Sequence, residues 1–377
     1  MKRRQCLSVG LSLPLWPWAV QAQAKLPLQF PRDLGSHPDF AIEWWYITGR
    51  LLAAQREFGF QITFFRSRLP DTQGMTSAFA AKQLIFAHAA VTDVANKNLL
   101  HDQRIARASG NAQLDLATAS EADTDLGLGN WSLKHAGNGN DNDNDNDNGS
   151  IYQAQASGSD FSFQLKLRET QALLLQGDQG WSRKGPETSQ ASYYYSLPQL
   201  QVSGQLSLGK QTLPVQGQAW LDHEWSNSLM HPQAVGWDWI GMNLDDGSAL
   251  TAFRLRTKEG DTLWAGGSLR ARGASSAEIF AETDVIFTPQ RHWKSPASGT
   301  SYPVQWSVQI RRVQAKTGLK VLERYTVNAV IDKQELDSRQ STGAIYWEGL
   351  SELLDSRGAV IGHGYLEMTG YARPLRL

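Results

Sequence analysis

The chain has 377 residues, with 36 basic and 37 acidic side chains and a formal net charge of −1 at pH 7. A chain without a surplus of basic residues is not typical of proteins that bind nucleic acid or anionic membranes, so we expect neither kind of partner. At this length two or three domains are expected.

The first 24 residues have the organisation of a secretory signal peptide. Basic residues at positions 2–4 (Lys-Arg-Arg) precede an apolar run, and residues 22–24 (Ala-Gln-Ala) form a small-x-small cleavage site. The apolar run is shorter than the roughly 20 residues that a membrane-spanning helix needs. We therefore predict cleavage after Ala24 and a periplasmic or secreted protein that does not span the membrane. The only cysteine, Cys6, lies in this segment, so the predicted mature chain has no disulfide and no thiol nucleophile.

The dominant pattern beyond the signal segment is a period of two. Residues 58–64, 161–167 and 304–310 alternate apolar with polar or small side chains and are rich in aromatic and β-branched types. This alternation predicts half-buried strands of antiparallel sheets. Convincing amphipathic helices are few, so the sequence favours an all-β fold built from sandwiches or barrels.

Residues 137–150 consist almost entirely of Asn, Asp and Gly. Such a tract cannot offset the entropy lost on ordering, so we predict a disordered surface loop inside the first domain. A calcium site is the alternative interpretation, but the tract lacks the fixed ligand spacing of an EF-hand loop.

The strand pattern breaks near the middle of the chain, where Ser226, Asn227, His231 and Pro232 interrupt it. This break predicts a domain boundary, which we place so that an N-terminal domain covers residues 25–222 and a C-terminal domain covers residues 223–377.

The segment of greatest chemical interest spans residues 220–225 (Trp-Leu-Asp-His-Glu-Trp). Acids and histidines among indoles are costly to bury unless they are paired or their pKa values shift, and such shifts suit proton transfer near neutral pH. We take His223, Trp225, Asp222 and Glu224 as candidate catalytic residues. On a strand His223 and Trp225 share one face, and Asp222 and Glu224 share the other. The competing interpretation of His223 is a structural histidine at the end of a sheet.

Three further segments combine acids with aromatic residues. They supply the candidate substrate-binding residues Glu43, Trp44, Trp45, Tyr46, Trp237, Asp238, Trp239, Tyr346 and Glu348. We expect these segments to meet residues 220–225 around one cavity. The alternatives are a core plug at the closed end of a barrel for residues 43–46, a surface acid for Asp238, and a hydrogen-bonded core histidine for His88.

Motifs for other chemistry are missing from the sequence. There is no nucleophile elbow, no phosphate-binding loop, no dinucleotide fingerprint and no histidine pair with metal-ligand spacing. We therefore expect no metal and no cofactor.

Residues 43–46 (Glu-Trp-Trp-Tyr), residues 220–225 and residues 362–371 (Gly-His-Gly-Tyr-Leu-Glu-Met-Thr-Gly-Tyr) form a set of motifs. Together they resemble the AttH-like secreted proteins and carotenoid 1,2-hydratases. The resemblance covers nearly the whole mature chain. It implies two lipocalin-like (calycin) antiparallel β-barrels packed side by side, with a cavity near their junction.

The resemblance also implies an activity, because the hydratases of this family add water to an isoprenoid double bond without a cofactor. His223 and Trp225 match the His-x-Trp pair implicated in those enzymes, whereas their Tyr-x-Asp pair has no counterpart in residues 243–252.

Two main hypotheses follow. The first is a hydro-lyase, similar to carotenoid 1,2-hydratase, that performs acid–base chemistry on an apolar isoprenoid or lipid-like substrate. The second is a non-catalytic periplasmic carrier of a hydrophobic ligand, associated with an ABC-type export system, as the resemblance to AttH-like proteins implies. A glycan hydrolase or binder is a third interpretation, because indoles stack on sugars and paired carboxylates cleave glycosidic bonds.

Overall fold

The computed structural model describes residues 25–111, 113–138, 149–228, 230–313 and 318–375. The predicted signal peptide and most of the predicted loop at 137–150 lie outside these ranges. Within them the chain is almost entirely β-strand, and the helical elements are the short 3-10 helices η1 (Arg32–Leu34) and η2 (Pro70–Thr72). The all-β prediction is confirmed. Neither helix in the described ranges has the length and apolar character needed to cross a bilayer.

The first sheet contains thirteen strands. In chain order they are β1 (Ile42–Ala53), β2 (Arg56–Arg68), β3 (Gln83–Asp93), β4 (Asn98–Ala108), β5 (Ala117–Ala119), β6 (Asp125–Leu128), β7 (Trp131–Asn138), β8 (Ser150–Ser157), β9 (Phe161–Arg168), β10 (Leu174–Leu175), β11 (Trp181–Arg183), β12 (Ala191–Leu208) and β13 (Gln211–Ser226). Their order in space is β4-β3-β2-β1-β13-β12-β9-β8-β7-β6-β5, and β10 and β11 pair with β12.

This sheet curls into a nearly closed antiparallel barrel, because β4 at one edge comes into contact with β5 and β6 at the other. The predicted alternation explains the barrel core. Phe58, Phe60 and Ile62 point from β2 into the interior and are fully buried there, together with apolar side chains from β1, β7, β9 and β12.

The second sheet contains ten strands. They are β14 (Gly236–Leu244), β15 (Ala249–Arg256), β16 (Thr262–Arg270), β17 (Glu278–Phe280), β18 (Val285–Lys294), β19 (Ser301–Val313), β20 (Lys320–Ala329), β21 (Glu335–Ser338), β22 (Ala344–Leu354) and β23 (Val360–Met368). Their order is β17-β16-β15-β14-β23-β22-β20-β19-β18, with β21 on β22. The two edges approach one another, since β18 contacts β16 and β19 contacts β17. The core inside this curved sheet is built around Trp306 and Trp347.

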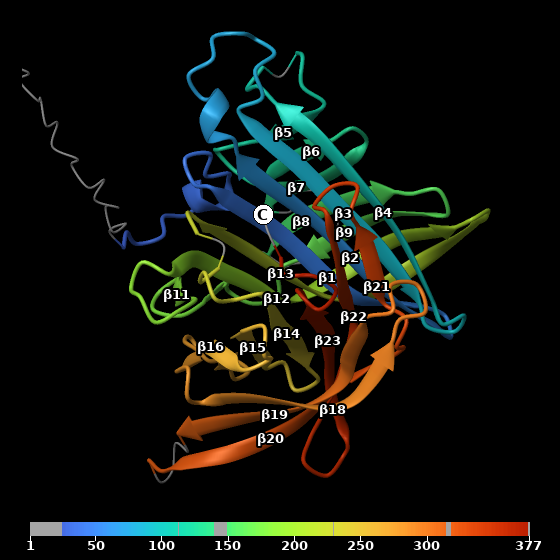
Figure 1. Ribbon diagram of the computed structural model, residues 1–377. Coiled ribbons are helices and arrows are strands. Elements are labelled where there is room, and N and C mark those ends of the chain that lie inside the picture. The colour runs from blue at the N-terminus through green and yellow to red at the C-terminus, as the bar shows by residue number, and fades with distance from the viewer. Residues whose placement is uncertain (1–24, 112, 139–148, 229, 314–317, 376–377) are drawn as a thin grey trace, which may run out of the picture.

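The two barrel-like sheets pack side by side, and the first lies above the second in Figure 1. Strands β1 and β13 of the first sheet face β14 and β23 of the second. A separate hydrophobic cluster fills this junction and includes Tyr46, Trp220, Trp239 and Phe253. The outer faces of β1 and β13 are therefore buried as well as their inner faces.

The change from one sheet to the other falls between the end of β13 at Ser226 and the start of β14 at Gly236. The division predicted after residue 222 falls inside β13, which stays hydrogen-bonded to β1 as far as Ser226. We therefore propose to place the domain boundary within residues 227–235.

Candidate functional site

The pleat of β1 and β13 distributes the motif residues over two separate environments. The strands pair so that Glu43 lies opposite Trp225, Trp45 opposite His223 and Tyr46 opposite Asp222. Side chains directly opposite each other in an antiparallel pair point to the same side of the sheet.

One set of motif residues therefore points into the first barrel, where it contributes to the core. This set comprises Glu43, Trp45, His223 and Trp225. The other set faces the second barrel.

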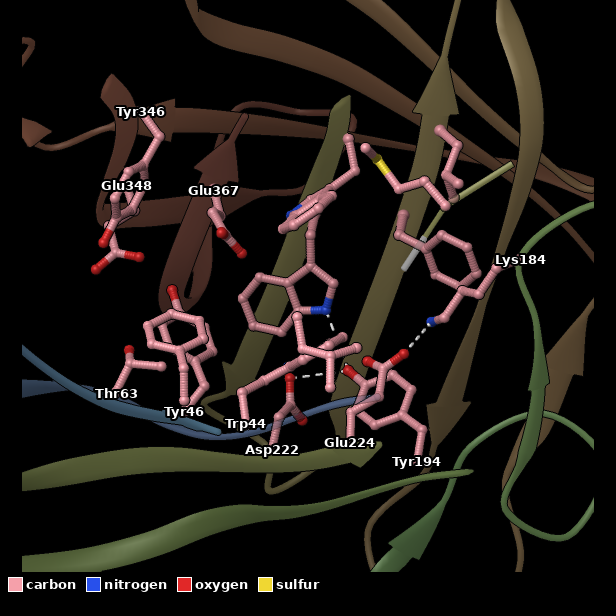
Figure 2. A pocket seen from close by; sticks show the side chains of 17 residues that line it. Trp44, Tyr46, Thr63, Lys184, Tyr194, Asp222, Glu224, Tyr346, Glu348 and Glu367 are labelled. Carbon is pink, nitrogen blue, oxygen red and sulfur yellow. Dashed lines mark hydrogen bonds and ion pairs between the residues drawn. The ribbon is translucent and has the colours of Figure 1, made fainter. Parts of the chain in front are cut away.

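The set that faces the second barrel lines a pocket at the junction, which contains about 820 Å³ of empty space, including space open to solvent. Figure 2 shows that aromatic walls surround several carboxylates. The aromatic lining residues are Trp44, Tyr46, Phe65, Tyr194, Trp237, Trp239, Phe253 and Tyr346, and the acidic ones are Asp222, Glu224, Glu348 and Glu367.

A glycine shapes this pocket. In β14, a side chain at Gly241 would place its Cβ 2.4 Å from the Trp239 ring, so only glycine leaves room for the indole in this position. Trp239 in turn donates a hydrogen bond from Nε1 to the Tyr194 hydroxyl, 3.2 Å away, which fixes the ring against the first barrel.

Asp222 is held at the pocket wall by three donors. The Ser196 hydroxyl and the Trp220 indole N–H donate to Oδ1 at 2.6 and 2.7 Å, and the Tyr194 hydroxyl donates to Oδ2 at 2.8 Å. Burial raises the pKa of Asp222 to about 7 and the negative charge of Glu224 adds to this effect, although the three hydrogen bonds oppose it. Asp222 can therefore both give and accept a proton near neutral pH.

Glu224 has a different environment, because it forms an ion pair with Lys184. The Lys184 Nζ lies 3.1 Å from Glu224 Oε1, and the Ser192 hydroxyl donates to the same oxygen. The ammonium group also lies over the ring of Phe253, 4.2 Å from its centre. Glu224 thus has a lysine as its ion-pair partner, whereas Asp222 has no cationic side chain among its hydrogen-bond partners.

Glu348 and Glu367 project from the neighbouring strands β22 and β23 on the opposite wall (Figure 2). Burial raises the pKa of Glu367 to about 7, and the negative charges of Asp222 and Glu224 add to the rise. Burial and the charge of Glu367 raise the pKa of Glu348 well above its ordinary value. The pocket therefore contains three carboxyl groups that retain a proton more readily than ordinary acids.

Inside the first barrel, His223 belongs to a hydrogen-bonded network around Glu43. Oε1 of Glu43 lies 2.9 Å from His223 Nε2 and 2.7 Å from His37 Nδ1, and Oε2 accepts from Arg66 Nε at 2.7 Å. The second ring nitrogen of His223, Nδ1, lies 3.0 Å from the Tyr195 hydroxyl. Burial lowers the pKa of His223 to about 4, although Glu43 opposes the shift, so the ring is neutral at pH 7. Burial disfavours the Glu43 carboxylate, but hydrogen bonds from His223 and His37 outweigh this and hold its pKa well below the usual range.

His37, Glu43 and His223 also have the residue types of a metal site, and their ligand atoms lie within 4.8 Å of one another. The surrounding groups do not fit a cation. The Arg66 guanidinium is paired with Glu43 at 2.7 Å, so its positive charge lies next to these ligand atoms and opposes a bound cation. The polar groups of this network bond to one another, so it forms a buried hydrogen-bonded cluster inside the first barrel.

The structure therefore corrects the expectation of one cavity lined by all candidates. His223, Trp225, Glu43 and Trp45 do not line the pocket, because the strand period of two turns them to the other face of the sheet. The predicted residues that do line the pocket are Asp222, Glu224, Trp44, Tyr46, Trp237, Trp239, Tyr346 and Glu348.

Asp238 and His88 also lie outside the pocket lining. Asp238 is fully buried and is paired with Arg254 and Arg256 at 2.7 and 3.1 Å, so it is not a surface acid. His88 is a buried histidine whose ring nitrogens bond to the hydroxyls of Tyr346 and Ser341 at 2.7 and 2.8 Å.

Sequence reasoning missed nine of the 17 residues that line the pocket, among them three with ionisable side chains, Lys184, Tyr194 and Glu367. The only signal for Glu367 was its place in the motif at 362–371. Lys184 and Tyr194 lie in segments that carry no motif.

Comparisons with known proteins agree with this fold. The AttH-like family profile matches residues 21–371. The crystal structure of a protein from Nitrosomonas europaea described as an AttH is 41% identical, with 93% of this chain and 99% of that one covered and a TM-score of 0.79. None of the curated protein sequences matches this chain.

Two further proteins of known structure share the fold at low identity. Kievitone hydratase from Nectria haematococca is 13% identical, with 92% of this chain and 94% of that one covered and a TM-score of 0.66. CghA, solved alone and with Sch210972, is 10% identical in its unliganded form, with 93% and 94% covered and a TM-score of 0.54. Both likenesses show the fold alone. The AttH-like profile, in contrast, matches nearly the whole chain, and this match shows that the protein belongs to the AttH-like family.

Proposed function

We propose that the junction pocket is the active site of a cofactor-free, hydratase-like acid–base catalyst that acts on an apolar isoprenoid or lipid-like substrate, with Asp222 as the proton donor. One observation carries the proposal: Asp222 is a buried acid with a pKa of about 7 in a pocket whose walls are mostly aromatic and aliphatic side chains. A general acid is most effective when its pKa lies near the working pH.

The chemistry that this arrangement supports is the addition of water to an alkene. The carboxyl proton of Asp222 forms a new C–H bond at one alkene carbon, and the electron pair of the π-bond leaves the other carbon as a cation. A water oxygen adds to that cation and then loses a proton to the Asp222 carboxylate, which restores the acid. The product is an alcohol, and the enzyme returns to its first state.

The pocket walls suit the cationic intermediate. Indole and phenol faces attract cations by about 0.5–2 kcal/mol each, and Trp44, Tyr46 and Trp239 line the same pocket as Asp222. Glu224 lies at the same wall, where it is paired with Lys184. His223, which the family resemblance implicates, would act in this scheme only through the strand that it shares with Asp222.

Turnover of a panel of linear isoprenoid alkenes tests the proposal. Wild-type protein should form alcohols, and Asp222→Asn should lower kcat by at least about a hundredfold, because a positioned acid contributes about 10²–10⁴-fold. Asp246→Asn, an exposed acid in a turn, is the matched control and should keep full activity. Full activity in Asp222→Asn would refute the assignment.

A non-catalytic carrier of a hydrophobic ligand, serving an ABC-type export system, is the second candidate. A specific observation favours it: the His-x-Trp pair implicated in the hydratases lies in the barrel interior rather than in the pocket. A carrier should bind the same isoprenoids, leave them unchanged after long incubation, and lose affinity when Trp239 is replaced by Ala.

We also propose that the protein is exported to the periplasm or secreted. The support is the basic, apolar and small-residue order of residues 1–24. Mass spectrometry of protein recovered from the periplasm should find Lys25 as the first residue, whereas protein that stays in the cytoplasm with Met1 intact would contradict export.

A further inference from the structure

The junction pocket is small for an isoprenoid ligand. Its 820 Å³ of empty space includes the gaps between atoms and the open mouth, whereas the volume that water molecules can reach inside it is about 90 Å³. For comparison, an engineered protein cavity of about 150 Å³ holds a single benzene molecule. The pocket as it stands therefore has room for about one isoprene unit, and the rest of a longer chain must lie elsewhere.

A larger depression at the surface adjoins this pocket, and we call it the outer groove. Water molecules can reach about 420 Å³ of it, and both barrels line it, the first with residues between 176 and 188 and the second with β16 and residues 279–282. The Arg183 guanidinium lies over the Trp264 ring, 4.9 Å from its centre, where β11 of the first sheet meets β16 of the second (Figure 1). The outer groove therefore follows the same seam between the barrels as the junction pocket.

Phe253 of β15 forms the partition between the two spaces, because it lines both of them. Its ring packs against Gly266, which lies directly opposite on β16 and whose Cβ, if present, would come within 3.0 Å of the ring atom Cζ. On the pocket side, the Lys184 Nζ lies over the same ring, and Figure 2 shows Lys184 at the opposite end of the pocket from Glu348. Rotation of the Phe253 side chain would therefore join the pocket to the outer groove at the end away from Glu348.

The two spaces suit different ends of one ligand. The junction pocket is buried, and its walls are mostly aromatic and aliphatic. The outer groove is open to solvent and presents the half-buried indoles of Trp181 and Trp264 beside the exposed polar side chains of Asp178, Thr188 and Glu282. An indole offers an apolar face together with a polar N–H group, so it suits the part of a ligand where an apolar chain meets a polar head.

We propose that the junction pocket and the outer groove form one continuous binding site for an elongated amphiphile, with its apolar end in the pocket and its polar head in the outer groove against Trp181 and Trp264. The inference rests on the proposed use of the junction pocket as a ligand site. It adds the length and the polarity of the ligand, and it identifies Phe253 as the side chain that moves on binding. It applies equally to a ligand that is converted and to one that is carried.

Photolabelling tests where each end of such a ligand lies. Two dodecan-1-ol probes differ only in the position of a diazirine, which is either next to the hydroxyl or at the far end of the chain. After irradiation of each complex, mass spectrometry of the digested protein identifies the labelled residues. We expect the far-end probe to label the pocket lining on β14, β15, β22 and β23, and the head-end probe to label residues 176–188 and 279–282.

A matched pair of variants tests the outer groove by affinity. Ile279 is 43% exposed and lines the outer groove, whereas Ile286 is 36% exposed on β18 of the same barrel and lines neither space. Ile279→Ser should weaken the binding of dodecan-1-ol by about threefold or more, because it removes apolar surface that the ligand covers. Ile286→Ser should leave the affinity unchanged. Both residues are exposed, so the melting temperature should stay close to that of the wild type in each variant.

The possible failures are distinguishable. Labelling of the pocket by both probes without labelling of the outer groove, a head-end label on Met230 or Ile42, or equal affinity of Ile279→Ser and Ile286→Ser would overturn the continuous site and leave the junction pocket as a ligand site. If the far-end probe labelled no residue of the junction pocket, that pocket would be refuted as a site for apolar chains, and the proposed function would fall together with this inference.

Discussion

The raised pKa of Asp222 predicts that this residue destabilises the protein at neutral and alkaline pH. Its pKa is about 7 in the folded protein and 3.8 when exposed. Between these values the folded state keeps a proton that the unfolded state has lost, so stability falls as pH rises through this window and the loss is complete above about pH 7. The whole difference corresponds to about 4 kcal/mol.

Asp222→Asn removes this titration. An asparagine has nearly the same shape and can accept hydrogen bonds at one oxygen from the neighbouring donors. From pH 5 to pH 8 the wild type should therefore lose about 3 kcal/mol of unfolding free energy relative to the variant, which is the part of the window covered by these two conditions. Glu367, whose pKa is raised in the same direction, remains in both proteins and contributes to both curves.

Urea unfolding of both proteins at pH 5, 6, 7 and 8 measures the difference by linear extrapolation. Glu367→Gln is a useful second variant. Relative to it, the wild type should also lose unfolding free energy as pH rises, because the pKa of Glu367 is raised in the same direction. A difference between wild type and Asp222→Asn that stays constant from pH 5 to pH 8 would refute the reasoning, since it would mean that Asp222 is ionised in the folded protein throughout.

Three further predictions concern other parts of the molecule. Glu43→Gln should cost about 3–5 kcal/mol of unfolding free energy at pH 7, because it leaves the buried Arg66 guanidinium without its anionic partner; a loss below about 1 kcal/mol in urea unfolding would contradict this. If the protein turns over alkenes, kcat/KM should fall as pH rises through about 7, because only protonated Asp222 can donate; a rate that increases over this range would exclude it as the acid. Deletion of residues 138–148 should leave the melting temperature almost unchanged, because the Asn/Asp tract has nothing to bury; a drop of many degrees in calorimetry would show that the tract is ordered.

The fold could be predicted from the sequence because alternation is a local property. The pattern at residues 58–64 gives β2, and the one at 304–310 gives part of β19, each with its apolar face in a core. The same period of two also separated His223 from Asp222 correctly. The place where each barrel ends was harder to define, because β13 carries the motif residues and continues beyond residue 222.

The composition of the site could not be predicted in the same way. Both faces of β1 and β13 are buried, one in the first barrel and one against the second, so acids and aromatic residues occur on both. Nothing local in the sequence tells which face meets the pocket. The contributions of Lys184 and Glu367 depend on how the two sheets pack, which brings together residues that are far apart in the chain.

The most direct test of Asp222 as a proton donor is the fate of solvent hydrogen. Incubation of the protein with a linear isoprenoid alkene in D₂O should give an alcohol that carries one deuterium on the carbon next to the new C–O bond, as mass spectrometry and NMR would show. Asp222→Asn should bind the same alkene and form no deuterated product. Recovery of unlabelled, unchanged alkene from the wild-type protein, in the presence of measured binding, would contradict catalysis at this pocket.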